Sequence, residues 1–510
     1  MVSCSDTGNK VINVNLKTKI MKSKALVILV FSSLILNIGC KKAETENVVS
    51  ASVSDSGTEI KMDGELPSKE SIPTLFDEMD FQQATQCYLW GLPIVAFAQW
   101  QQIHYKTFNA SSNDLVFYNT YNDRLGILTG NATTPYIMSF IDLAVNGPTV
   151  IEMPAGHTAG GLGDFWQREQ AVIGEMGPDK GKGGKYILVP PTMKDFKPAG
   201  YFIVPCRTVN MFFGFRALDP DPKVTETLVK QVKIYPYDKR ANPVPTKVVS
   251  PPAGKKWYGI QPTGIAYWER LHAILQNEPV EERDRFFMAW LRNLGVEKGK
   301  PFNPDERQKK ILIAAAEKGQ QMAMANSFEK RFKDVKHWPD KKWDYVMIIK
   351  DPSQHADNYD EFFERTSYFY EAVTYSKAMI TKIPNVGQAY LGCYFDNTGN
   401  WLDGGKNYTL NVPANPPAVN FWSITIYDVA TRCLIDNPQK NADLSSRKDL
   451  IKNADGSVDL YFGPKAPAGK EKNWVQTLPG KHWFTYMRFY GPTQAYFDKS
   501  WKMDDIKEVK

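Results

Sequence analysis

The glycine-rich stretch around His157 carries residue types suited to acid–base chemistry. The sequence runs Ala-Gly-His-Thr-Ala-Gly-Gly-Leu-Gly-Asp from Ala155, so Asp164 follows His157 by seven positions. A histidine oriented by a carboxylate is a common general base. These two residues are therefore the candidate catalytic pair of a hydrolase acting on a glycan, amide or ester. The alternative is a surface loop that holds an incidental histidine.

Metal and cofactor chemistry have no comparable motif. The chain has six histidines, and none forms HxH, HExxH or a Cys/His pair at ligand spacing, so we expect no metal site. The G-x-S-x-G elbow of α/β-hydrolases is also missing from the sequence. Residues 181–185 (Gly-Lys-Gly-Gly-Lys) lack phosphate-loop spacing and predict a turn. We therefore expect no cofactor.

Carboxylates close to this stretch suggest a second kind of chemistry. Asp164, Glu169 and Glu175 lie within a dozen residues of one another. Two carboxylates about 5–10 Å apart can hydrolyse a glycosidic bond. Their separation in space decides whether any two of them form such a pair.

Two aromatic strands near the C-terminus place an arginine in a defined row. Side chains alternate between the two faces of a strand. On Val419–Asp428, one face then holds Asn420, Trp422, Ile424, Ile426 and Asp428, and the other Phe421, Ser423, Thr425 and Tyr427. On Trp483–Tyr490, one face holds Phe484, Tyr486, Arg488 and Tyr490.

Arg488 within this row needs a partner, because a buried unpaired guanidinium is costly. It could bind a ligand carboxylate, or pair with Asp428 or another carboxylate as a structural bridge, and we favour the bridge. Asn473 and Trp474 follow a Gly- and Pro-containing loop. An amide beside a tryptophan suits sugar binding, although the tryptophan could equally close the end of a sandwich.

The elements that would position these residues change along the chain. Short β-like runs separated by Gly, Pro, Asn and Asp fill residues 115–220 and 388–510, a pattern typical of sandwiches. Helical signals dominate between them. Asn303-Pro304-Asp305-Glu306 predicts a helix start with Asn303 as N-cap and Pro304 at the first helical position. A further helix is predicted over residues 76–102, with a break or kink at Gly91-Leu92-Pro93.

Specific C-terminal motifs resemble a known family. They are DGGKNYTL (403–410), NFWSITIYD (420–428), NADGSVDLYFGP (453–464), PAGKEKNW (467–474) and RFYGP (488–492). A weaker, collinear N-terminal match begins at NATTPYIMSFIDL (131–143). Together they resemble the bacterial tandem family of domains of unknown function numbered 1254 and 1214. The resemblance implies two jelly-roll-like antiparallel β-sandwiches with a helical region, and no established activity. Asn131, Tyr136 and Trp422 join Asn473, Trp474 and Arg488 as candidate ligand-binding residues.

Composition limits the partners. Residues 1–39 carry five lysines and one aspartate, so the remaining chain has a net charge of +2 rather than +6. This near-neutral balance gives no electrostatic reason to expect nucleic acid. Six cysteines in 510 residues are too few for a disulfide scaffold. Of these, we expect Cys87, Cys206, Cys393 and Cys433 to be mostly small buried apolar residues.

The N-terminus resembles a lipoprotein leader. Met21 is the expected start, followed by Lys22 and Lys24, an apolar run over residues 25–36 and Gly39-Cys40. We expect cleavage before Cys40 and lipid on its thiol, although a plain secretory signal or a retained anchor would share much of this pattern. Residues 40–75 predict a flexible tether to the membrane.

These patterns give one organisation and three functional hypotheses. We expect a leader (1–39), a tether (40–75), an N-terminal sandwich (76–222), a mainly helical region (223–385) and a C-terminal sandwich (386–510), giving an α+β fold. The preferred hypothesis is a lipid-anchored protein of the bacterial envelope, at the outer membrane or periplasmic face, which binds a small-molecule or glycan-like ligand. The alternatives are the hydrolase and a structural homo-oligomer.

Overall fold

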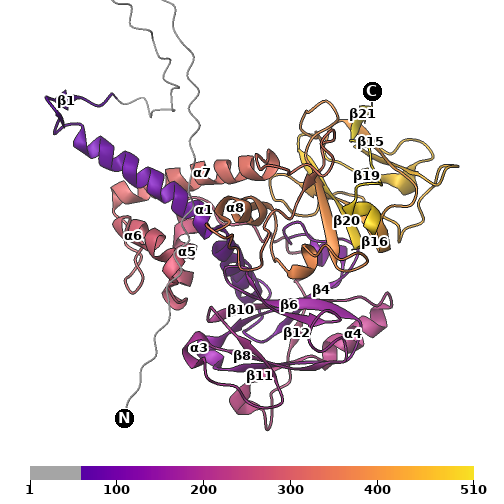
Figure 1. Cartoon of the computed structure of the whole chain (residues 1–510), viewed down its shortest axis with the longest axis horizontal. Coiled ribbons are helices and arrows are strands. Elements are labelled where there is room, and N and C mark those ends of the chain that lie inside the picture. Colours follow the sequence, from indigo (N-terminus) through magenta and orange to yellow (C-terminus); the bar gives the residue numbers. More distant parts are fainter. Residues whose placement is uncertain (1–58, 510) are drawn as a thin grey trace, which may run out of the picture. The chain divides into compact units, whose positions relative to one another are not determined.

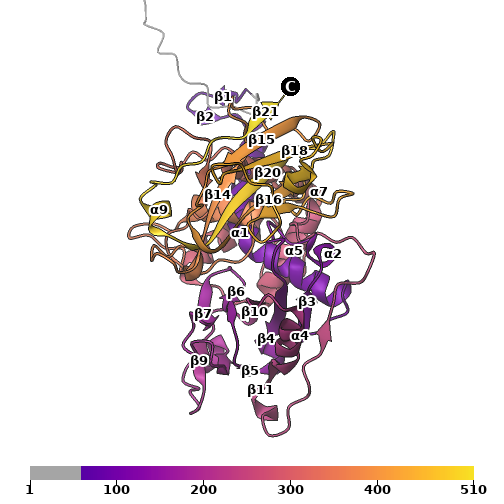
Figure 2. The same ribbon diagram turned by 90° about the vertical axis from the view of Figure 1, so that its right-hand side faces the viewer.

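The computed structural model describes residues 59–509. They form two β-sandwiches and a set of helices (Figures 1 and 2). The fold class is α+β, as the sequence predicts. The expected leader, Cys40 and most of the expected tether lie outside the described residues.

The N-terminal sandwich has its own apolar core. Alternation turns Ile137, Ile141 and Phe213 from one sheet toward Ile151 and Leu188 from the other. The larger sheet has the order β12-β3-β4-β10-β6-β7 and the smaller β11-β5-β8-β9. Their bounds are β12 (Val248–Val249), β3 (Leu115–Tyr118), β4 (Tyr136–Asp142), β10 (Asn210–Ala217), β6 (Thr158–Asp164), β7 (Glu169–Gly174), β11 (Lys233–Pro236), β5 (Thr149–Met153), β8 (Gly184–Val189) and β9 (Phe202–Pro205).

The C-terminal sandwich repeats this plan. Leu391, Ile424 and Met487 of one sheet and Leu410 and Leu460 of the other belong to the same core. The larger sheet has the order β13-β14-β20-β16-β17 and the smaller β19-β18-β15-β21. Their bounds are β13 (Asp344–Tyr345), β14 (Gln388–Cys393), β20 (Trp483–Pro492), β16 (Ala418–Asp428), β17 (Asp443–Ser445), β19 (Trp474–Gln476), β18 (Val458–Gly463), β15 (Asn407–Val412) and β21 (Lys507–Val509).

The four sheets are not wholly antiparallel, which corrects the expectation. β12 runs parallel to β3, β9 to β8 and β19 to β18. β12, β9 and β19 each lie at an edge of their sheet. Long connections bring these edge strands back to the sheet, and such connections permit parallel pairing where a hairpin does not. β11 and β12 come from the stretch predicted to be mainly helical.

The helices are built around α1 (Ile72–Lys106), which is buried along most of its second half. Pro93 lies inside it and leaves the carbonyl of Leu89 without its helical donor. The hydroxyl of Thr366 on α8 lies 3.4 Å from that carbonyl, but it donates to the Phe362 carbonyl of its own helix at 2.7 Å. The other helices are α2 (Tyr121–Arg124), α3 (Leu143–Asn146), α4 (Pro222–Gln231), α5 (Ile265–Asn277), α6 (Arg285–Asn293), α7 (Glu306–Phe328), α8 (Phe362–Glu371) and α9 (Gln494–Phe497).

Helix α7 begins two residues later than predicted. Asp305, not Asn303, is the N-cap, and it forms a capping box with Gln308. The Asp305 carboxylate accepts from the backbone N–H of Gln308 at 2.8 Å, and the Gln308 side chain accepts from the backbone N–H of Asp305 at 2.7 Å. The sequence pattern alone does not decide between the two starts, because Glu306 follows Asn303 by three positions just as Gln308 follows Asp305.

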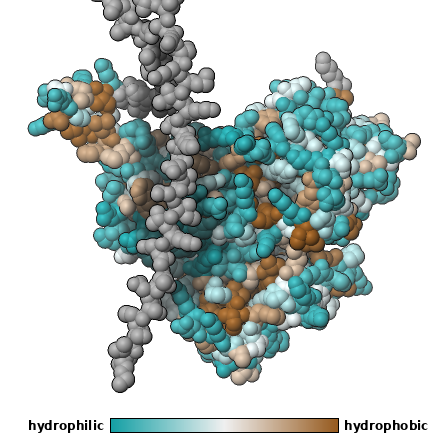
Figure 3. Space-filling model, viewed as in Figure 1, coloured by the Kyte–Doolittle hydropathy of each residue, from teal (hydrophilic) through white to brown (hydrophobic). Residues whose placement is uncertain are grey.

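The surface at the N-terminal end of α1 is apolar. Met62, Leu66, Leu75, Phe76 and Met79 are exposed large hydrophobic residues. Figure 3 shows the apolar patch at this end of the helix. No helix within residues 59–509 is long and apolar enough to cross a membrane.

Cysteines do not crosslink the described part of the chain. Cys87, Cys206, Cys393 and Cys433 are all buried and free. Burial raises the pKa of each thiol well above its usual value. The four therefore serve as small apolar core residues, as predicted.

Candidate functional site

A cavity of about 400 Å³ lies where the two sandwiches meet. One wall is the face of β4, β6 and β10 turned away from the N-terminal core, with Met138, Ala159 and Arg216. The other wall is the corresponding face of β14 and β20, with Tyr390 and Arg488. Figure 2 shows these two sheets one above the other. The cavity exists because each large sheet has a second face that its own core leaves uncovered.

Glycines keep the N-terminal wall thin. Gly161 of β6 and Gly214 of β10 are cross-strand partners, and both line the cavity. A Cβ on Gly214 would come within 2.5 Å of the Phe212 ring. The glycine-rich sequence after His157 therefore leaves room above a sheet, a role that the sequence alone does not reveal.

Asn131 positions two tyrosines of the cavity. Its backbone N–H donates to the Tyr136 hydroxyl at 2.8 Å, and its side-chain amide donates to the Tyr490 hydroxyl at 2.7 Å. Tyr136 and Tyr490 line the cavity from opposite sandwiches. Asn131 is buried, and it acts on this site by orienting its neighbours. Three of the six candidate ligand-binding residues, Asn131, Tyr136 and Arg488, therefore lie at or beside the same cavity.

Arg488 forms no carboxylate bridge with any residue in the range 59–509, and our favoured prediction for it, a bridge with Asp428 or another carboxylate, is wrong. Its guanidinium donates to the Tyr427 hydroxyl and, at 2.6 Å, to the Thr129 carbonyl. Asp428 instead pairs with Lys481 at 2.9 Å. The reason is alternation: Arg488 is the cross-strand partner of Ser423, whereas Asp428 points to the other face of β16.

His157 and Asp164 do not form the expected pair. They flank β6 (Thr158–Asp164), and seven extended residues separate them by roughly 20 Å. His157 Nδ1 lies 2.7 Å from Glu175 Oε1, and its side chain is 76% exposed. The carboxylate partner of His157 is therefore Glu175, and neither His157 nor Asp164 lines the cavity with Arg488. His157, Asp164 and Arg488 therefore do not converge on one site.

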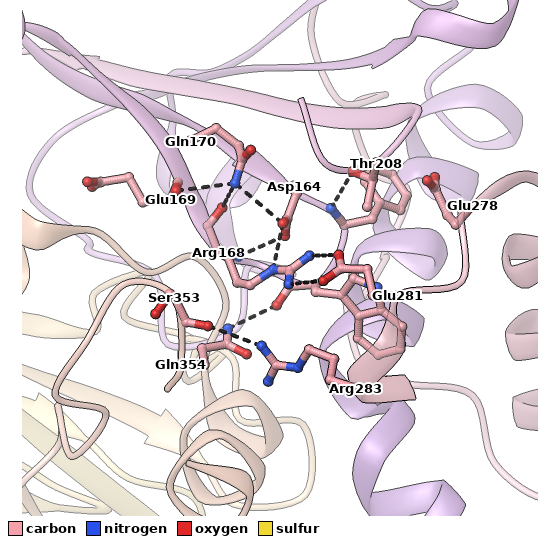
Figure 4. A network of polar contacts seen from close by, with 12 residues as sticks. Asp164, Arg168, Glu169, Gln170, Thr208, Glu278, Glu281, Arg283, Ser353 and Gln354 are labelled. Atoms are coloured by element: carbon pink, nitrogen blue, oxygen red, sulfur yellow. Dashed lines mark hydrogen bonds and ion pairs between the residues drawn. The ribbon is translucent and has the colours of Figure 1, made fainter. Parts of the chain in front are cut away.

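Asp164 belongs to a buried ionic network instead. Arg168 lies between Asp164 and Glu281 (Figure 4). Arg168 Nε is 2.7 Å from Asp164 Oδ2, and a second guanidinium nitrogen is 2.8 Å from Glu281 Oε2. Burial raises the pKa of Asp164 even though Arg168 opposes the shift. The network ties β6 to the segment before α6.

The three carboxylates near this stretch do not make a glycosidase pair. Glu169 and Glu175 both line the cavity, but they lie at opposite ends of β7 (Glu169–Gly174). Six extended residues separate them by roughly 20 Å, well beyond the 5–10 Å that glycosidases use. Glu169 accepts the backbone N–H of Lys377 at 2.8 Å. Asp164 is occupied by Arg168.

The other candidate ligand-binding residues lie away from the cavity. Trp422 shares the sandwich-facing side of β16 with Ile424. Asn473 is buried, and its amide is fully used: it donates to the carbonyls of Ile451 and Asp459 at 2.8 Å. Trp474 donates its indole N–H to the Gly463 carbonyl at 3.0 Å. Asn473 and Trp474 thus support the smaller C-terminal sheet and do not lie with Arg488.

Sequence reasoning missed several cavity residues. Arg216 interrupts the apolar run of β10 just as Arg488 interrupts β20. This signal was present in the sequence. Tyr368 and Thr374, in contrast, come from helix α8 and the segment after it. Nothing in their local sequence connects them with two distant sheets.

No group of three His, Cys, Asp or Glu side chains within residues 59–509 is arranged to hold a metal ion. The polar groups that line the cavity are hydroxyls, amides, two guanidinium groups and two carboxylates, and these carboxylates lie at opposite ends of β7, too far apart to share a metal ion. What the arrangement can do chemically is bind and orient a molecule through hydrogen-bond donors and aromatic rings.

The two domains that form the walls of this cavity each match a known family model. Residues 112–236 match the family model "Protein of unknown function (DUF1254)", and residues 387–494 match "Protein of unknown function (DUF1214)". The first match contains β4, β6 and β10, and the second contains β14, β16 and β20. The cavity therefore lies between the two matched domains. No curated protein matches the chain.

Two solved structures are similar to this chain. The VPA0106 protein from Vibrio parahaemolyticus is 20% identical, with a TM-score of 0.52, and the match covers 84% of this chain and all of that one. A putative uncharacterized protein from Burkholderia cenocepacia is 11% identical, with a TM-score of 0.41, and the match covers 86% of this chain and 97% of that one. The first likeness shows that the fold recurs. With these two matches in this order, the chain carries a DUF1254 domain followed by a DUF1214 domain, as in the tandem family that its motifs resemble.

Proposed function

We propose that the protein binds a small organic molecule in the cavity between its two sandwiches. The observation that carries this proposal is the cavity itself, at about 400 Å³ and lined by both family domains. Sites for small ligands commonly enclose about 300–1,000 Å³, with aromatic walls and a few oriented polar groups. The cavity fits this description, because its walls combine Phe212 and Tyr390 with the guanidinium of Arg488.

The polar groups are held in place before any ligand arrives. Tyr368 donates its hydroxyl to the Thr374 carbonyl at 2.8 Å, and Asn131 orients Tyr136 and Tyr490. The Tyr490 ring stacks on Phe421 with centroids 4.0 Å apart. Such restraint lowers the entropic cost of binding. It supports a binding site in preference to an accidental void.

A panel of small aromatic and glycan-like compounds should contain one that raises the melting temperature of the full chain. At 100 times its Kd, a ligand stabilises the folded state by about 2.7 kcal/mol. Ala159→Phe, which fills the cavity, should abolish the shift. Ala430→Phe is the matched control, because Ala430 is exposed and lies outside the cavity. A shift that survives Ala159→Phe would place binding elsewhere.

We also propose that the protein is a lipid-anchored component of the bacterial envelope. The leader pattern ending at Gly39-Cys40 supports this. Cys40→Ser should move the protein from the membrane pellet to the soluble fraction and abolish labelling by a palmitate analogue. Unchanged fractionation and labelling would refute the anchor. The homo-oligomer remains a prediction, which the exposed apolar patch near α1 supports.

A further inference from the structure

Two arginines share the cavity and have no carboxylate partner. Arg488 is 4% exposed and Arg216 is partly exposed, and both line the cavity. Among residues 59–509, no Asp or Glu oxygen lies within ion-pair distance of either guanidinium. A buried charge without a counter-charge is costly. An anionic group placed in the cavity would remove this cost.

The arginines retain unused donors. A guanidinium carries five N–H groups. Arg488 donates to the Tyr427 hydroxyl and the Thr129 carbonyl. Within the part of the chain that the structure describes, Arg216 donates only to the Tyr490 hydroxyl, at 3.3 Å. Aromatic rings flank Arg488 on several sides, with the Tyr486 centroid at 5.2 Å and the Tyr390 centroid at 5.4 Å. These rings fix the guanidinium without neutralising its charge.

Neighbouring hydroxyls add further donors. The Tyr490 oxygen accepts from Asn131 and from Arg216, so its own proton is available to a ligand. The buried Tyr486 hydroxyl, in contrast, lies next to the Glu371 carboxylate, which attracts its proton, so it adds no free donor. The Tyr136 oxygen accepts from the Asn131 backbone. This part of the cavity is therefore rich in donors and poor in acceptors, which favours an anion over a neutral sugar.

The carboxylates that do reach the cavity have partners of their own. Glu175 pairs with His157 at 2.7 Å, and Glu169 accepts from the Lys377 backbone. Glu371, which is buried near Tyr486, accepts from Tyr394 at 2.9 Å and lies 3.3 Å from Lys330 Nζ. None of these carboxylates is a partner of the two arginines. The basic end of the cavity thus keeps its charge for a ligand.

We propose that the ligand carries an oxyanion, either a carboxylate or a phosphate, which Arg216 and Arg488 bind together. Its apolar body then lies against the aromatic side chains of the two sheets. This inference rests on the proposed binding function and specifies its ligand class. Each domain supplies one arginine, Arg216 from β10 and Arg488 from β20. Binding therefore joins the DUF1254 and DUF1214 domains through one group, which explains why the site needs both.

The test compares benzoate and phenyl phosphate with neutral benzamide, by calorimetry on the full chain. At least one anion should bind at least 10-fold more tightly than benzamide, and the tighter anion identifies the group. Arg488→Met and Arg216→Met should each weaken the anion by roughly 10- to 100-fold, the usual effect of losing a charged hydrogen bond. The corresponding Lys variants should recover only part of this, because lysine lacks the planar fork.

Arg240→Met is the matched control. Arg240 is exposed, stacks over the Tyr237 ring at 4.1 Å and does not line the cavity, so its loss should leave anion affinity within about twofold. Arg216→Met is the less disruptive of the two substitutions, because the Arg216 side chain makes a single long hydrogen bond. It therefore tests the proposal even if Arg488→Met fails to fold. Circular dichroism should show both Met variants folded.

The outcomes separate this inference from the proposed function. If benzamide binds as tightly as the anions and the arginine variants have no effect, the oxyanion is refuted, while binding in the cavity stands. If neither anion binds the wild-type chain at millimolar concentration, the oxyanion is again refuted. If in addition no compound of the wider panel gives a shift sensitive to Ala159→Phe, the binding function falls with it.

Discussion

Lowering the pH from 7 to 5 is expected to destabilise the protein strongly through His104. This histidine is 1% exposed and lies among Trp100, Phe108 and Phe140. Its Nε2 is 2.7 Å from the Tyr118 hydroxyl, which itself accepts from the Trp100 indole. The hydroxyl proton can then go to Nε2 only while the imidazole is neutral. Burial lowers the pKa of His104 to about 3.

The sign of the effect follows from the two states. A histidine in the unfolded chain titrates near about 6.5, so below that pH the unfolded state binds a proton that the folded state refuses. The contribution of His104 to the free energy of unfolding is fully present above about pH 6.5, and it is lost progressively as the pH falls toward 3. Each pKa unit corresponds to about 1.4 kcal/mol, so the loss is about 2 kcal/mol at pH 5. His337, whose pKa burial also lowers to about 3, adds a loss of the same sign.

Denaturant titrations at pH 7, 6 and 5 measure this effect. His104→Gln should lower the free energy of unfolding at pH 7 but reduce its pH dependence by about one proton. Phe108→Leu is the control: it removes packing against the His104 ring but no titratable group and no hydrogen bond, so its slope should match the wild type. A variant comparison is needed because buried carboxyls titrate with the opposite sign. Glu278, whose pKa burial raises to about 7, is one of them. An unchanged slope in His104→Gln would refute this account.

Arg168→Met is expected to lower the free energy of unfolding by about 3–5 kcal/mol. The substitution removes the guanidinium that pairs with Asp164, whose side chain is fully buried, and it also removes the partner of Glu281 (Figure 4). The lost attraction matters less than the buried charge left behind. The deficit should shrink as the pH falls, since a stranded carboxyl can then take up a proton.

Arg307→Met is the matched control for this prediction. Arg307 also contacts two carboxylates, those of Asp77 and Asp80, but its side chain is 43% exposed. A solvated pair of this kind contributes less than about 1 kcal/mol. Urea denaturation of both variants at pH 7 measures the contrast. Equal losses would show that burial is not what gives the Arg168 network its importance.

Much of the fold could be predicted because it depends on local geometry. Alternation placed Tyr486, Arg488 and Tyr490 on one face of a strand, and the register of β20 confirms it. Backbone geometry imposes this period on any strand, whatever lies around it. The family resemblance is likewise confirmed by the two domain matches. Helix starts are less certain from sequence, since Asn303 and Asp305, two positions apart, both suit an N-cap.

Partners across the fold could not be predicted in this way. The sequence correctly singled out Arg488 as a residue that needs explanation, but it suggested Asp428 as its partner. The tertiary structure gives it the Thr129 carbonyl, 359 residues away, and a cavity shared with Arg216. His157 and Asp164 are close in sequence and distant in space, because an extended strand separates them. The sequence by itself determined which residues share a face. Only the tertiary structure decided which faces meet, because that depends on how two separate sandwiches pack around the helices between them.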